Sequence, residues 1–451
     1  MSGNSRIFRT LVEVFEEAGV PYCILAGYDG LPEDIASDID FMIDPEWAQH
    51  LPVLLQIIAE RSGAHMVQCI HHETTATYFA LASLEDGALS YLHPDSSTDY
   101  RRSGRLWLNA GPVLAARRRH RNGFWVPSPA DAFAYYLIKK IDKGGLNDKQ
   151  AAELSSRYAE DPQGCEEALR RMFFAASAQM IANAARSGDW RYVSLSLSRL
   201  AEELQRRVGA ESLRDRARQL VADARRIAGR VGQPTGLSIA FLGADGAGKS
   251  TLIRRVSEEL GESFRQVRYR HLRPGLLPAR AATAGAGPVV DPYGRPMRGS
   301  AASVLKLLHF WADYVIGGVL WLYPLRVRST LVIFDRYYHD LLADPRRYRY
   351  GASPALARWL GRLVPQPDLC FVLDVPAEIL QLRKQEVALD ESRRQRDAYI
   401  ETAADLRGAR VIDASRPIDE VVARVLEQVI EYMEARTAHR LALETREPCK
   451  A

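Results

Sequence analysis

One glycine-rich segment restricts the possible folds of this 451-residue chain more than any other feature. It reads Gly243-Ala-Asp-Gly-Ala-Gly-Lys-Ser-Thr251 and lies between an apolar run at residues 237–242 and a helical run at residues 252–260. The order of strand, G-x-x-x-x-G-K-[ST] loop and helix is typical of a loop that wraps phosphate groups. Its glycines let successive backbone N–H groups face an anion at the positive end of the following helix. The segment therefore predicts a nucleotide-binding α/β domain.

The residues of this loop have separate expected roles. We expect Lys249 to contact the β- and γ-phosphates of ATP and the Ser250 hydroxyl to ligate Mg²⁺. The remaining nucleotide contacts are expected from Gly243, Gly246, Gly248 and Thr251. ATP and Mg²⁺ are therefore the predicted cofactors.

Two later segments indicate what kind of nucleotide-binding domain this is. One strand-like run ends in Val332-Ile-Phe-Asp-Arg-Tyr337, and another reads Pro367-Asp-Leu-Cys-Phe-Val-Leu-Asp-Val-Pro376. With Asp245 inside the loop, the set resembles the thymidylate kinases, whose motifs are G-x-D-x-x-G-K-[ST]-T, D-R-[YFH] and L-D-V-P. The resemblance covers most of residues 237–434 and implies an ATP-dependent phosphotransferase.

Besides Lys249, the resemblance implies catalytic roles for three further residues. Asp245 occupies the acidic position that faces the acceptor in the family. Asp335 is expected at the carboxyl end of a strand, where open α/β sheets bind ligands, and would orient a magnesium water or the acceptor. Arg336 would clamp a phosphate group.

The segment Glu391-Ser-Arg-Arg-Gln-Arg396 occupies the place of the family's lid. The resemblance implies that Arg393, Arg394 and Arg396 close over the transferring phosphoryl group. The alternative is an exposed arginine-rich helix without a catalytic role.

The acceptor side departs from the family pattern. Thymidylate kinases carry a helix reading L-L-F-x-A-x-R, and the corresponding Leu307-Leu-His-Phe-Trp-Ala-Asp-Tyr314 places Tyr314 at the arginine position. The following segment Asp344-Pro-Arg-Arg-Tyr-Arg-Tyr-Gly351 suits a phosphorylated, ring-containing acceptor, or is a charged connection fixed by tyrosine packing. The identity of the acceptor therefore stays open at this point.

The N-terminal part contains a second constellation. Asp38 and Asp40 lie two residues apart on a β-like run, so both side chains point to one face and can chelate a divalent metal. With Ile24-Leu-Ala-Gly27 upstream, the pattern resembles the nucleotidyltransferase superfamily, which reads hG[GS] and then Dh[DE]h. The resemblance implies a third carboxylate on a later strand, for which Asp95 is the candidate and Asp99 the fallback.

This constellation also departs from its family. Tyr28 replaces the small residue after the motif glycine, and Asp29 follows in the loop expected to receive a triphosphate. Lys139, Lys140 and Lys143 would face a triphosphate, or form a solvated helix end. The pattern thus predicts a nucleotidyltransferase-like fold and leaves open whether it is active or only binds.

The predicted organisation has four parts. Residues 1–148 form an α+β nucleotidyltransferase-like domain, 149–232 a helical segment, 236–434 a doubly wound parallel-sheet kinase domain, and 435–451 a C-terminal tail. Strands are expected at residues 22–25, 41–43, 77–81, 89–92, 331–334, 369–373 and 410–412. A long loop is expected at residues 273–298, which are rich in Pro, Gly and Ala.

Composition limits the setting of the protein. The net charge of +4 is small, and the cluster of Arg117, Arg118, Arg119 and Arg121 is interpreted as a solvated face, so no nucleic acid is expected. The five cysteines lack metal or disulfide spacing, and no signal peptide is visible, which favours the cytoplasm. Residues 304–325 are interpreted as a buried helix and not as a membrane span.

These observations predict a kinase that transfers the γ-phosphoryl group of ATP to a small, phosphorylated, nucleoside monophosphate-like acceptor. One alternative is a kinase for a sugar or lipid-linked intermediate of surface polysaccharide synthesis. Another is a regulatory or assembly protein that binds nucleoside triphosphates without an acceptor. A homodimer is compatible with each alternative.

Overall fold

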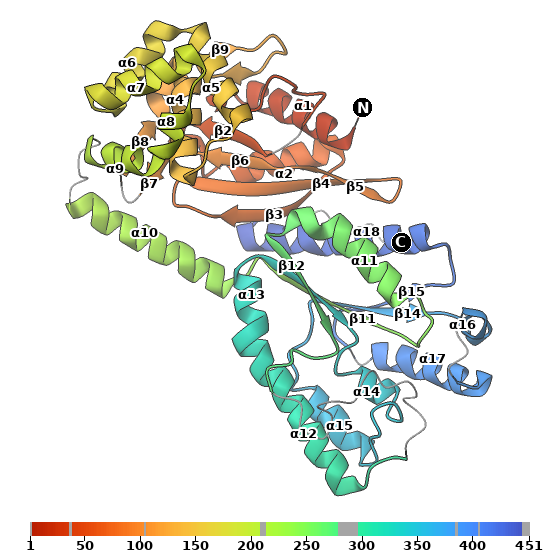
Figure 1. Ribbon diagram of the computed structural model, residues 1–451. Helices are drawn as coiled ribbons and strands as arrows, with labels where there is room; N and C mark the ends of the chain where they lie inside the picture. The colour runs from red at the N-terminus through yellow and green to blue at the C-terminus, as the bar shows by residue number, and fades with distance from the viewer. Residues whose placement is uncertain are drawn as a thin grey trace. The chain divides into compact units, whose positions relative to one another are not determined.

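The computed structural model describes residues 2–35, 38–102, 105–207, 213–277, 296–383, 387–404 and 406–443 (Figure 1). Internal contacts divide the chain into two compact units. Unit 1 contains residues 1–83, 90–228 and 433–451, and unit 2 contains residues 84–89 and 229–432.

Unit 1 contains a mixed sheet and many helices. Its strands are β1 Tyr22–Ile24, β2 Ile39–Ile43, β3 His65–His71, β4 Ala76–Glu85, β5 Ala88–Leu92, β6 Pro94–Ser97, β7 Asp99–Arg102, β8 Arg105–Asn109, β9 Arg118–Arg119 and β10 Trp125–Val126. Its helices are α1 Gly3–Glu17, η1 Pro45–Trp47, α2 Leu51–Ser62, α3 Ala110–Ala115, α4 Pro129–Lys143, α5 Asp148–Glu160, α6 Pro162–Met172, α7 Ala175–Ser187, α8 Arg191–Leu195, α9 Leu197–Arg207 and α10 Leu213–Gly232.

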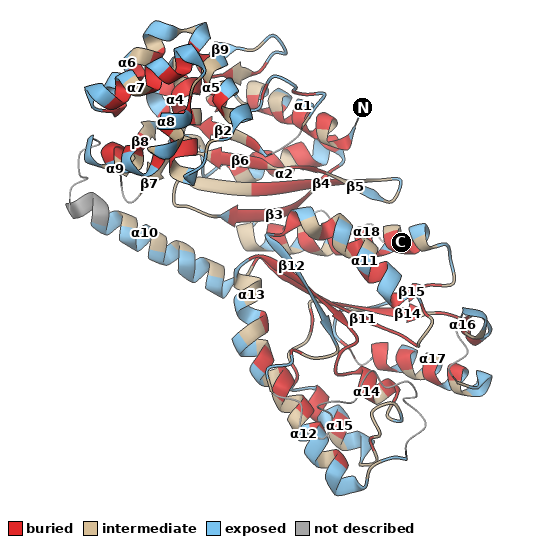
Figure 2. Cartoon of the chain, in the orientation of Figure 1, coloured by how far each residue is buried: buried red, intermediate tan, exposed pale blue. Residues whose placement is uncertain are grey.

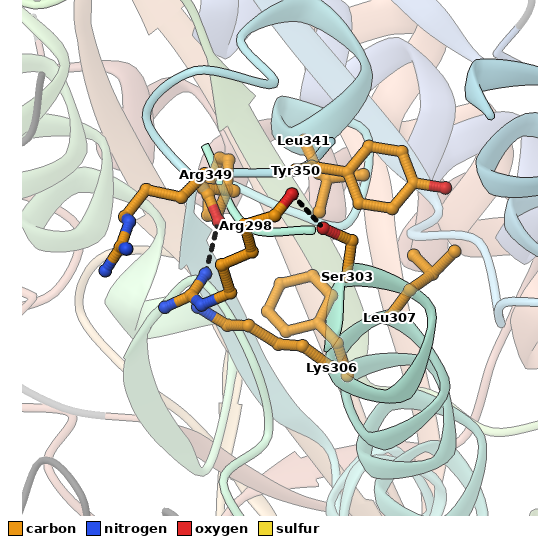
Figure 3. Close-up of a pocket in the computed structure, with 9 residues that line it drawn as sticks. Arg298, Ser303, Lys306, Leu307, Leu341, Arg349 and Tyr350 are labelled. Atoms are coloured by element: carbon orange, nitrogen blue, oxygen red, sulfur yellow. Dashed lines mark hydrogen bonds between the residues drawn. The ribbon is translucent and has the colours of Figure 1, made fainter. Parts of the chain in front are cut away.

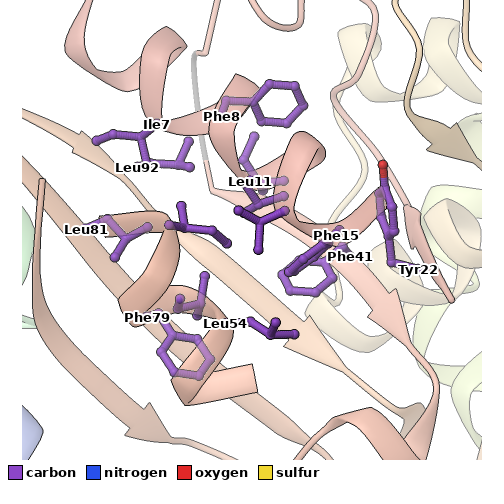
Figure 4. Close-up of a cluster of buried hydrophobic side chains, with 14 of the residues drawn as sticks. Ile7, Phe8, Leu11, Phe15, Tyr22, Phe41, Leu54, Phe79, Leu81 and Leu92 are labelled. Atoms are coloured by element: carbon purple, nitrogen blue, oxygen red, sulfur yellow. The ribbon is translucent and has the colours of Figure 1, made fainter. Parts of the chain in front are cut away.

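The main sheet of unit 1 has the strand order β1-β2-β6-β4-β3, with β5 paired to β4. The pair β2–β6 is parallel, while β1–β2, β3–β4 and β4–β6 are antiparallel. In α1, Ile7, Leu11 and Phe15 recur at helical spacing and are fully buried against the sheet (Figure 4). This core holds β2, and with it Asp40, in place.

The helix that carries the predicted lysines is well delimited by its sequence. Ser128 caps α4 by accepting from the Asp131 backbone N–H, Pro129 occupies its first turn, and Gly144 ends it with φ of 65°. Phe133, Leu137 and Ile141 face a core shared with α5 to α9. The opposite face of α4 is therefore free to present Lys139 and Lys143.

Unit 2 is an α/β unit. Its strands are β11 Leu237–Leu242, β12 Gln266–His271, β13 Thr330–Asp335, β14 Leu369–Asp374 and β15 Ala409–Asp413. Its helices are α11 Lys249–Leu260, η2 Gly261–Ser263, α12 Ser300–Gly317, the π-helical turn η4 Gly318–Leu322, α13 Tyr323–Val327, α14 Asp340–Ala343, α15 Pro354–Gly361, α16 Ala377–Arg383 and α17 Leu389–Ala404. Helix α18, Ile418–Leu441, begins in this unit.

The sheet of unit 2 is parallel throughout, with the order β12-β13-β11-β14-β15. Strands β11 and β13 are buried along their whole length, as is typical of central strands covered on both faces. Because all strands are parallel, the segments after β11, β13 and β14 emerge at the same edge. The glycine-rich loop, Arg336 and Asp374 therefore meet there.

The contacts divide the chain differently from the predicted ranges. Helices α5 to α9, within the predicted segment 149–232, share a core with α4 and belong to unit 1. Residues 435–451 are not simply a tail, because α18 continues to Leu441 and its last residues belong to unit 1. Of the predicted loop at 273–298, residues 278–295 lie outside the described residues.

The predicted buried helix at residues 304–325 is a helix, but it is only partly buried. By length and composition alone the run Ser300–Val327 could cross a membrane, and 39% of its most apolar window is buried inside the folded chain. Core helices of globular proteins also meet this criterion. Val319 and Leu320 are 63% and 67% exposed, so the prediction is wrong for this face (Figure 2).

Candidate active site

The glycine-rich loop connects β11 to α11, as the sequence predicts. Gly243, Gly246 and Gly248 have φ angles of 145°, 86° and 89°, a region that side-chain-bearing residues rarely adopt. A Cβ atom on Gly243 would lie 3.1 Å from the carbonyl oxygen of Leu373 in β14. All three glycines are therefore favoured by the turns of the backbone, and Gly243 also by its close approach to the neighbouring strand.

Lys249 is held inside this loop. Its Nζ donates to the carbonyl oxygens of Gly243 and Ala244 at 2.7 and 2.8 Å, and its side chain is 7% exposed. Burial, and after it the nearby Arg336 charge, lowers the pKa of Lys249 to about 8. The loop thus holds a poorly neutralised cation at the start of a helix, where ATP phosphates would supply the missing negative charge.

We expect ATP affinity to fall as the pH rises above about 8. Below this pKa Lys249 is already charged, while above it ATP binding must be accompanied by proton uptake, at a cost approaching tenfold in affinity per pH unit. Calorimetric ATP titrations at about pH 7 and about pH 9, each in two buffers of different ionisation enthalpy, measure both effects. In Lys249→Arg, which stays charged, the same titrations should show no such dependence, and a flat wild-type profile would contradict the expectation.

Asp335 lies at the carboxyl end of β13, beside the loop. Its Oδ2 accepts from the Tyr269 hydroxyl at 3.0 Å and lies 3.8 Å from Nδ1 of His271, both on β12. Its Oδ1 is buried and has no hydrogen-bond partner among the described residues. Burial raises the pKa of Asp335, but His271, Lys249 and Tyr269 outweigh this effect and lower the pKa below its usual value.

The free Oδ1 of Asp335 fits a divalent cation. Mg²⁺ usually binds proteins through one or two carboxylates and completes its coordination with waters and substrate phosphates. Among the described residues, no group of three or more His, Cys, Asp or Glu side chains is placed to hold a metal ion. Asp335 and the exposed Ser250 would therefore hold Mg²⁺ together with ATP.

Arg336 follows Asp335 in a strained backbone conformation. Its φ is 72°, and its N–H donates to the Phe241 carbonyl oxygen of β11 at 2.9 Å. Non-glycine residues at positive φ concentrate at functional sites, where the surrounding structure offsets the strain. This geometry aims the side chain of Arg336 toward the loop, where Nη2 donates to Asp245.

A buried network fixes Arg336 from behind. Its Nη1 donates to Oδ2 of Asp340 at 2.7 Å, and the Asp340 side chain is fully buried. Asp340 also accepts from the hydroxyls of Tyr348 and Tyr399 at 2.6 and 2.5 Å. The network connects the acceptor-side segment 344–351 and helix α17 to the arginine of the D-R-Y motif.

Asp245 joins two arginines at the loop. It accepts from Arg336 and from Nη1 of Arg347, and Lys249 Nζ lies 4.0 Å from its Oδ1. The predicted acceptor-facing carboxylate thus holds two cations at the mouth of the loop. Either guanidinium could exchange this carboxylate for a phosphate group.

The three predicted lid arginines lie on α17 and are paired with carboxylates. Arg393 contacts Glu378 at 2.8 Å, Arg394 contacts Glu391 at 2.6 Å, and Arg396 contacts Asp374 at the end of β14 at 2.5 Å. Their side chains are 53%, 43% and 36% exposed. Asp374 brings Arg396 to the edge of the sheet where the loop emerges, while the closing role of all three stays a prediction.

Tyr314, at the position of the family's arginine, belongs to the core. Its ring packs against Phe310 and Tyr337 at centroid distances of 5.3 and 4.8 Å, and its hydroxyl donates to the Leu272 carbonyl oxygen. Burial raises the pKa of Tyr314 far above its usual value. This residue therefore cannot present the cation that thymidylate kinases use here.

The N-terminal carboxylates lie in unit 1 as neighbours. Asp40 on β2 is opposite Asp95 on the parallel strand β6, and Lys139 donates to Asp40. Burial, and after it Asp95 and Asp38, raises the pKa of Asp40 against the opposing effect of Lys139. Oδ1 of Asp95 lies 2.9 Å from Nε2 of His72. The metal-binding role of the three carboxylates stays a prediction.

The fallback residue Asp99 lies elsewhere, on β7, where it accepts from the Ala110 N–H at 3.2 Å. A cavity of about 610 Å³ lies beside Asp38 and Asp40. Its lining includes Gly27, Asp29, Lys139, Lys140, Lys143 and Lys149. Tyr28 points into the core instead, where its hydroxyl accepts from Arg157 at 3.0 Å.

Sequence reasoning missed several residues of the unit 2 site. Tyr269 and His271 lie on β12, a polar strand without an apolar pattern. Asp340 is four residues after Arg336, a spacing that allows an ion pair and could have been noticed. Tyr399 is 59 residues from Asp340 in the sequence and had no local indication.

Comparison with known proteins supports the C-terminal resemblance. No family model matches the chain. A thymidylate kinase of Xanthomonas campestris pv. campestris is 30% identical over 205 residues, which cover 42% of this chain and 81% of that protein. A thymidylate kinase of Xanthomonas euvesicatoria pv. vesicatoria is 29% identical over 209 residues, with the same two shares. A probable thymidylate kinase of Pyrobaculum aerophilum is 29% identical over 204 residues, covering 42% of this chain and 95% of that protein.

The matched lengths are close to the length of unit 2, which holds the glycine-rich loop and the D-R-Y motif. The chain thus contains a thymidylate kinase-like phosphotransferase region. No relative of the predicted nucleotidyltransferase part is among these proteins, and that part of the resemblance stays a prediction. Over about 42% of its length, the chain belongs to the thymidylate kinase family.

Proposed function

We propose that unit 2 transfers the γ-phosphoryl group of ATP, with Mg²⁺, to a small phosphorylated acceptor. The observation that carries this proposal is the meeting of Lys249, Asp335 and Arg336 at the carboxyl edge of the parallel sheet. Each is buried, and each has an atom or a charge that ATP, Mg²⁺ or an acceptor phosphate would satisfy.

Each residue has a distinct task in this proposal. Lys249 and the N–H groups of the loop hold the ATP phosphates, and Asp335 with Ser250 holds Mg²⁺, which offsets phosphate charge when bound. Arg336 and Arg347, which donate to Asp245 in the structure, would donate to the acceptor phosphate instead. These contacts would position the acceptor in line with the γ-phosphoryl group. Catalysis then comes from positioning and charge stabilisation, because phosphoryl transfer needs little covalent chemistry from the protein.

The acceptor distinguishes this proposal from its alternatives. Tyr314 lacks the charge of the family's arginine, which favours a sugar or lipid-linked acceptor over thymidine monophosphate. A regulatory protein without an acceptor would hydrolyse or hold ATP regardless of added phosphate esters. ADP release measured with nucleoside monophosphates and with sugar phosphates separates these three possibilities. Only a kinase releases more ADP as the concentration of its own acceptor rises.

We expect Asp335→Asn to lower kcat on the order of 10²- to 10³-fold and to raise the Mg²⁺ concentration needed for half-maximal rate. The amide keeps the hydrogen bond from Tyr269 but supplies weaker metal ligation. ATP affinity measured without Mg²⁺ should change little. Glu262→Gln, at an exposed carboxylate in η2, is the matched control. Unchanged kcat and Mg²⁺ dependence in Asp335→Asn would reject its role.

We further propose that the unit 1 cavity binds a nucleoside triphosphate with a divalent metal. The supporting observation is that Gly27, Asp38 and Asp40 line one cavity together with four lysines. In the full chain carrying Lys249→Ala, CTP should bind only when Mn²⁺ or Mg²⁺ is present, because the metal relieves the repulsion between the carboxylates.

The double substitution Asp38→Asn plus Asp40→Asn should remove this binding, while Glu46→Gln, an exposed carboxylate beyond β2, should not. Titration of labelled CTP measures both. Binding that is independent of metal, or that survives the double substitution, would reject the site. Binding without nucleotide transfer would indicate that the domain binds nucleotides but has lost catalysis.

A further inference from the structure

A pocket in unit 2 collects three positive charges, and no carboxylate side chain is among the described residues that line it. It lies between α12 and the segment that follows α14, and its cationic lining residues are Arg298, Lys306 and Arg349. Apolar side chains, including Leu307, Phe310 and Leu341, form the rest of the lining. In Figure 3, the charged ends of the three cations lie on one side of the pocket, with Leu307 and Tyr350 on the other.

None of the three cations is paired with a carboxylate among the described residues. Nη1 of Arg298 donates to the Tyr348 carbonyl oxygen at 2.9 Å, and Nε of Arg349 donates to the Pro296 carbonyl oxygen at 2.9 Å. Lys306 makes no hydrogen bond or ion pair within the described part of the chain. By contrast, the neighbouring Arg347 is paired with Asp245.

The three neighbouring cations repel one another in the unliganded chain. Partial burial of the amino group, and after it Arg298 and Arg349, lowers the pKa of Lys306 to about 8, although much of its side chain is exposed. Like charges that gather without a partner destabilise a fold, and a bound anion removes this cost. The pocket is narrow, with about 10 Å³ of open volume, so an occupant must displace these flexible side chains.

The pocket is connected to the phosphoryl-transfer site. Tyr348 lines the pocket, and its hydroxyl donates to Asp340, which holds Arg336. The preceding residue, Arg347, donates to Asp245 at the glycine-rich loop. A molecule in contact with Tyr348 and the three cations therefore lies on the acceptor side of Arg336.

We propose that this pocket binds a second anionic group of the acceptor, a phosphate or a carboxylate, apart from the group that receives the phosphoryl. The inference rests on the proposed phosphotransferase function. It expects the end of the acceptor that enters this pocket to be a charged group and not a neutral nucleobase. Phosphorylated sugars with a further phosphate or an acid group are the substrate class that fits.

The transfer step itself is unchanged by this proposal. An acceptor oxygen forms a bond to the γ-phosphorus, the bond from that phosphorus to the β–γ bridging oxygen breaks, and ADP leaves with the electron pair. A phosphate oxygen of the acceptor has no proton to lose at neutral pH, so the three cations only bind and orient.

The first test measures binding of inorganic phosphate and of acetate to the full chain saturated with magnesium and a non-hydrolysable ATP analogue. We expect Lys306→Gln and Arg349→Gln each to weaken phosphate binding about 10- to 100-fold, the range of a lost charge-assisted hydrogen bond. Arg358→Gln and Arg362→Gln, at exposed cations in and after α15, are the matched controls and should bind like the wild type. Acetate distinguishes a carboxylate subsite from one that requires phosphate.

Wild-type affinity in Lys306→Gln and Arg349→Gln, or no anion binding by the wild type, would overturn the subsite.

The second test compares ADP release with glucose 1-phosphate, glucose 1,6-bisphosphate, glucuronic acid 1-phosphate and thymidine monophosphate. We expect a doubly anionic acceptor to have the highest kcat/KM, and this preference to disappear in Lys306→Gln. If the doubly anionic acceptors were phosphorylated equally by the wild type and by Lys306→Gln, the subsite would be wrong while the kinase function stands. Failure of the wild type to bind ATP would instead reject the kinase function.

Discussion

Lys249→Ala is expected to abolish ATP turnover, with a loss on the order of at least 10²- to 10³-fold in kcat. Lys249 is the cation held against the Gly243 and Ala244 carbonyl oxygens inside the loop, so its removal takes away charge stabilisation of the transferring phosphoryl group. ATP-dependent ADP release, measured with and without acceptor, checks the prediction.

The same substitution should leave the fold stable. Because burial lowers the pKa of Lys249 to about 8, its charge at neutral pH opposes folding, and its removal relieves that cost. Thermal unfolding should therefore show no loss of Tm. Arg254→Ala, at a residue 62% exposed on the same helix α11, is the matched control for activity. Turnover in Lys249→Ala equal to that of Arg254→Ala would reject the site.

Arg336→Ala is expected to reduce both stability and phosphoryl transfer. The substitution leaves the buried carboxylate of Asp340 without its ion-pair partner, which costs about 3–5 kcal/mol when such a pair is broken. Phosphoryl transfer should fall at least on the order of 10²-fold, since the acceptor clamp is lost. Denaturant unfolding and acceptor-dependent ADP release measure the two effects separately.

Arg336→Lys keeps the prediction testable if the alanine variant does not fold. Lysine retains the charge that Asp340 requires but cannot bind Asp245 and Asp340 through the two arms of a guanidinium. We expect a folded protein with ATP affinity near that of the wild type and a strongly reduced kcat. A folded Arg336→Lys variant with wild-type kcat would contradict the role of the guanidinium.

The sequence predicts the centre of unit 2 well because its central strands are buried on both faces. The apolar runs at 237–242, 331–334 and 369–373 agree with β11, β13 and β14 to within one residue. The edge strand β12 was not predicted, since its six residues are all exposed and four of them are Gln, Arg or His, so it has no apolar run. Likewise β6, which carries Asp95, reads Pro-Asp-Ser-Ser and is specified by its pairing with β2 and β4.

The residues of the candidate site also fall into those that the sequence predicts and those that depend on tertiary packing. The loop residues and Asp335 follow from local motifs, because the motif itself encodes the turn and the strand end. The partner Tyr399 does not, since it reaches Arg336 and Asp340 only after α17 has packed against the segment that follows β13, whereas Asp340 lies four residues after Arg336. Sequence spacing likewise placed arginines on α17 but did not show that Glu378, Glu391 and Asp374 already pair with them.

The fate of the γ-phosphoryl group of ATP decides whether unit 2 is a kinase. The full chain is incubated with magnesium, γ-labelled ATP and either the acceptor panel or a low-molecular-mass metabolite extract, and the labelled products are separated. We predict that label moves to a small phosphorylated acceptor, in a reaction that requires Mg²⁺ and is lost in Lys249→Ala. Label found only in inorganic phosphate, at a rate that no acceptor changes, would contradict phosphoryl transfer and leave an ATP-hydrolysing or ATP-binding protein.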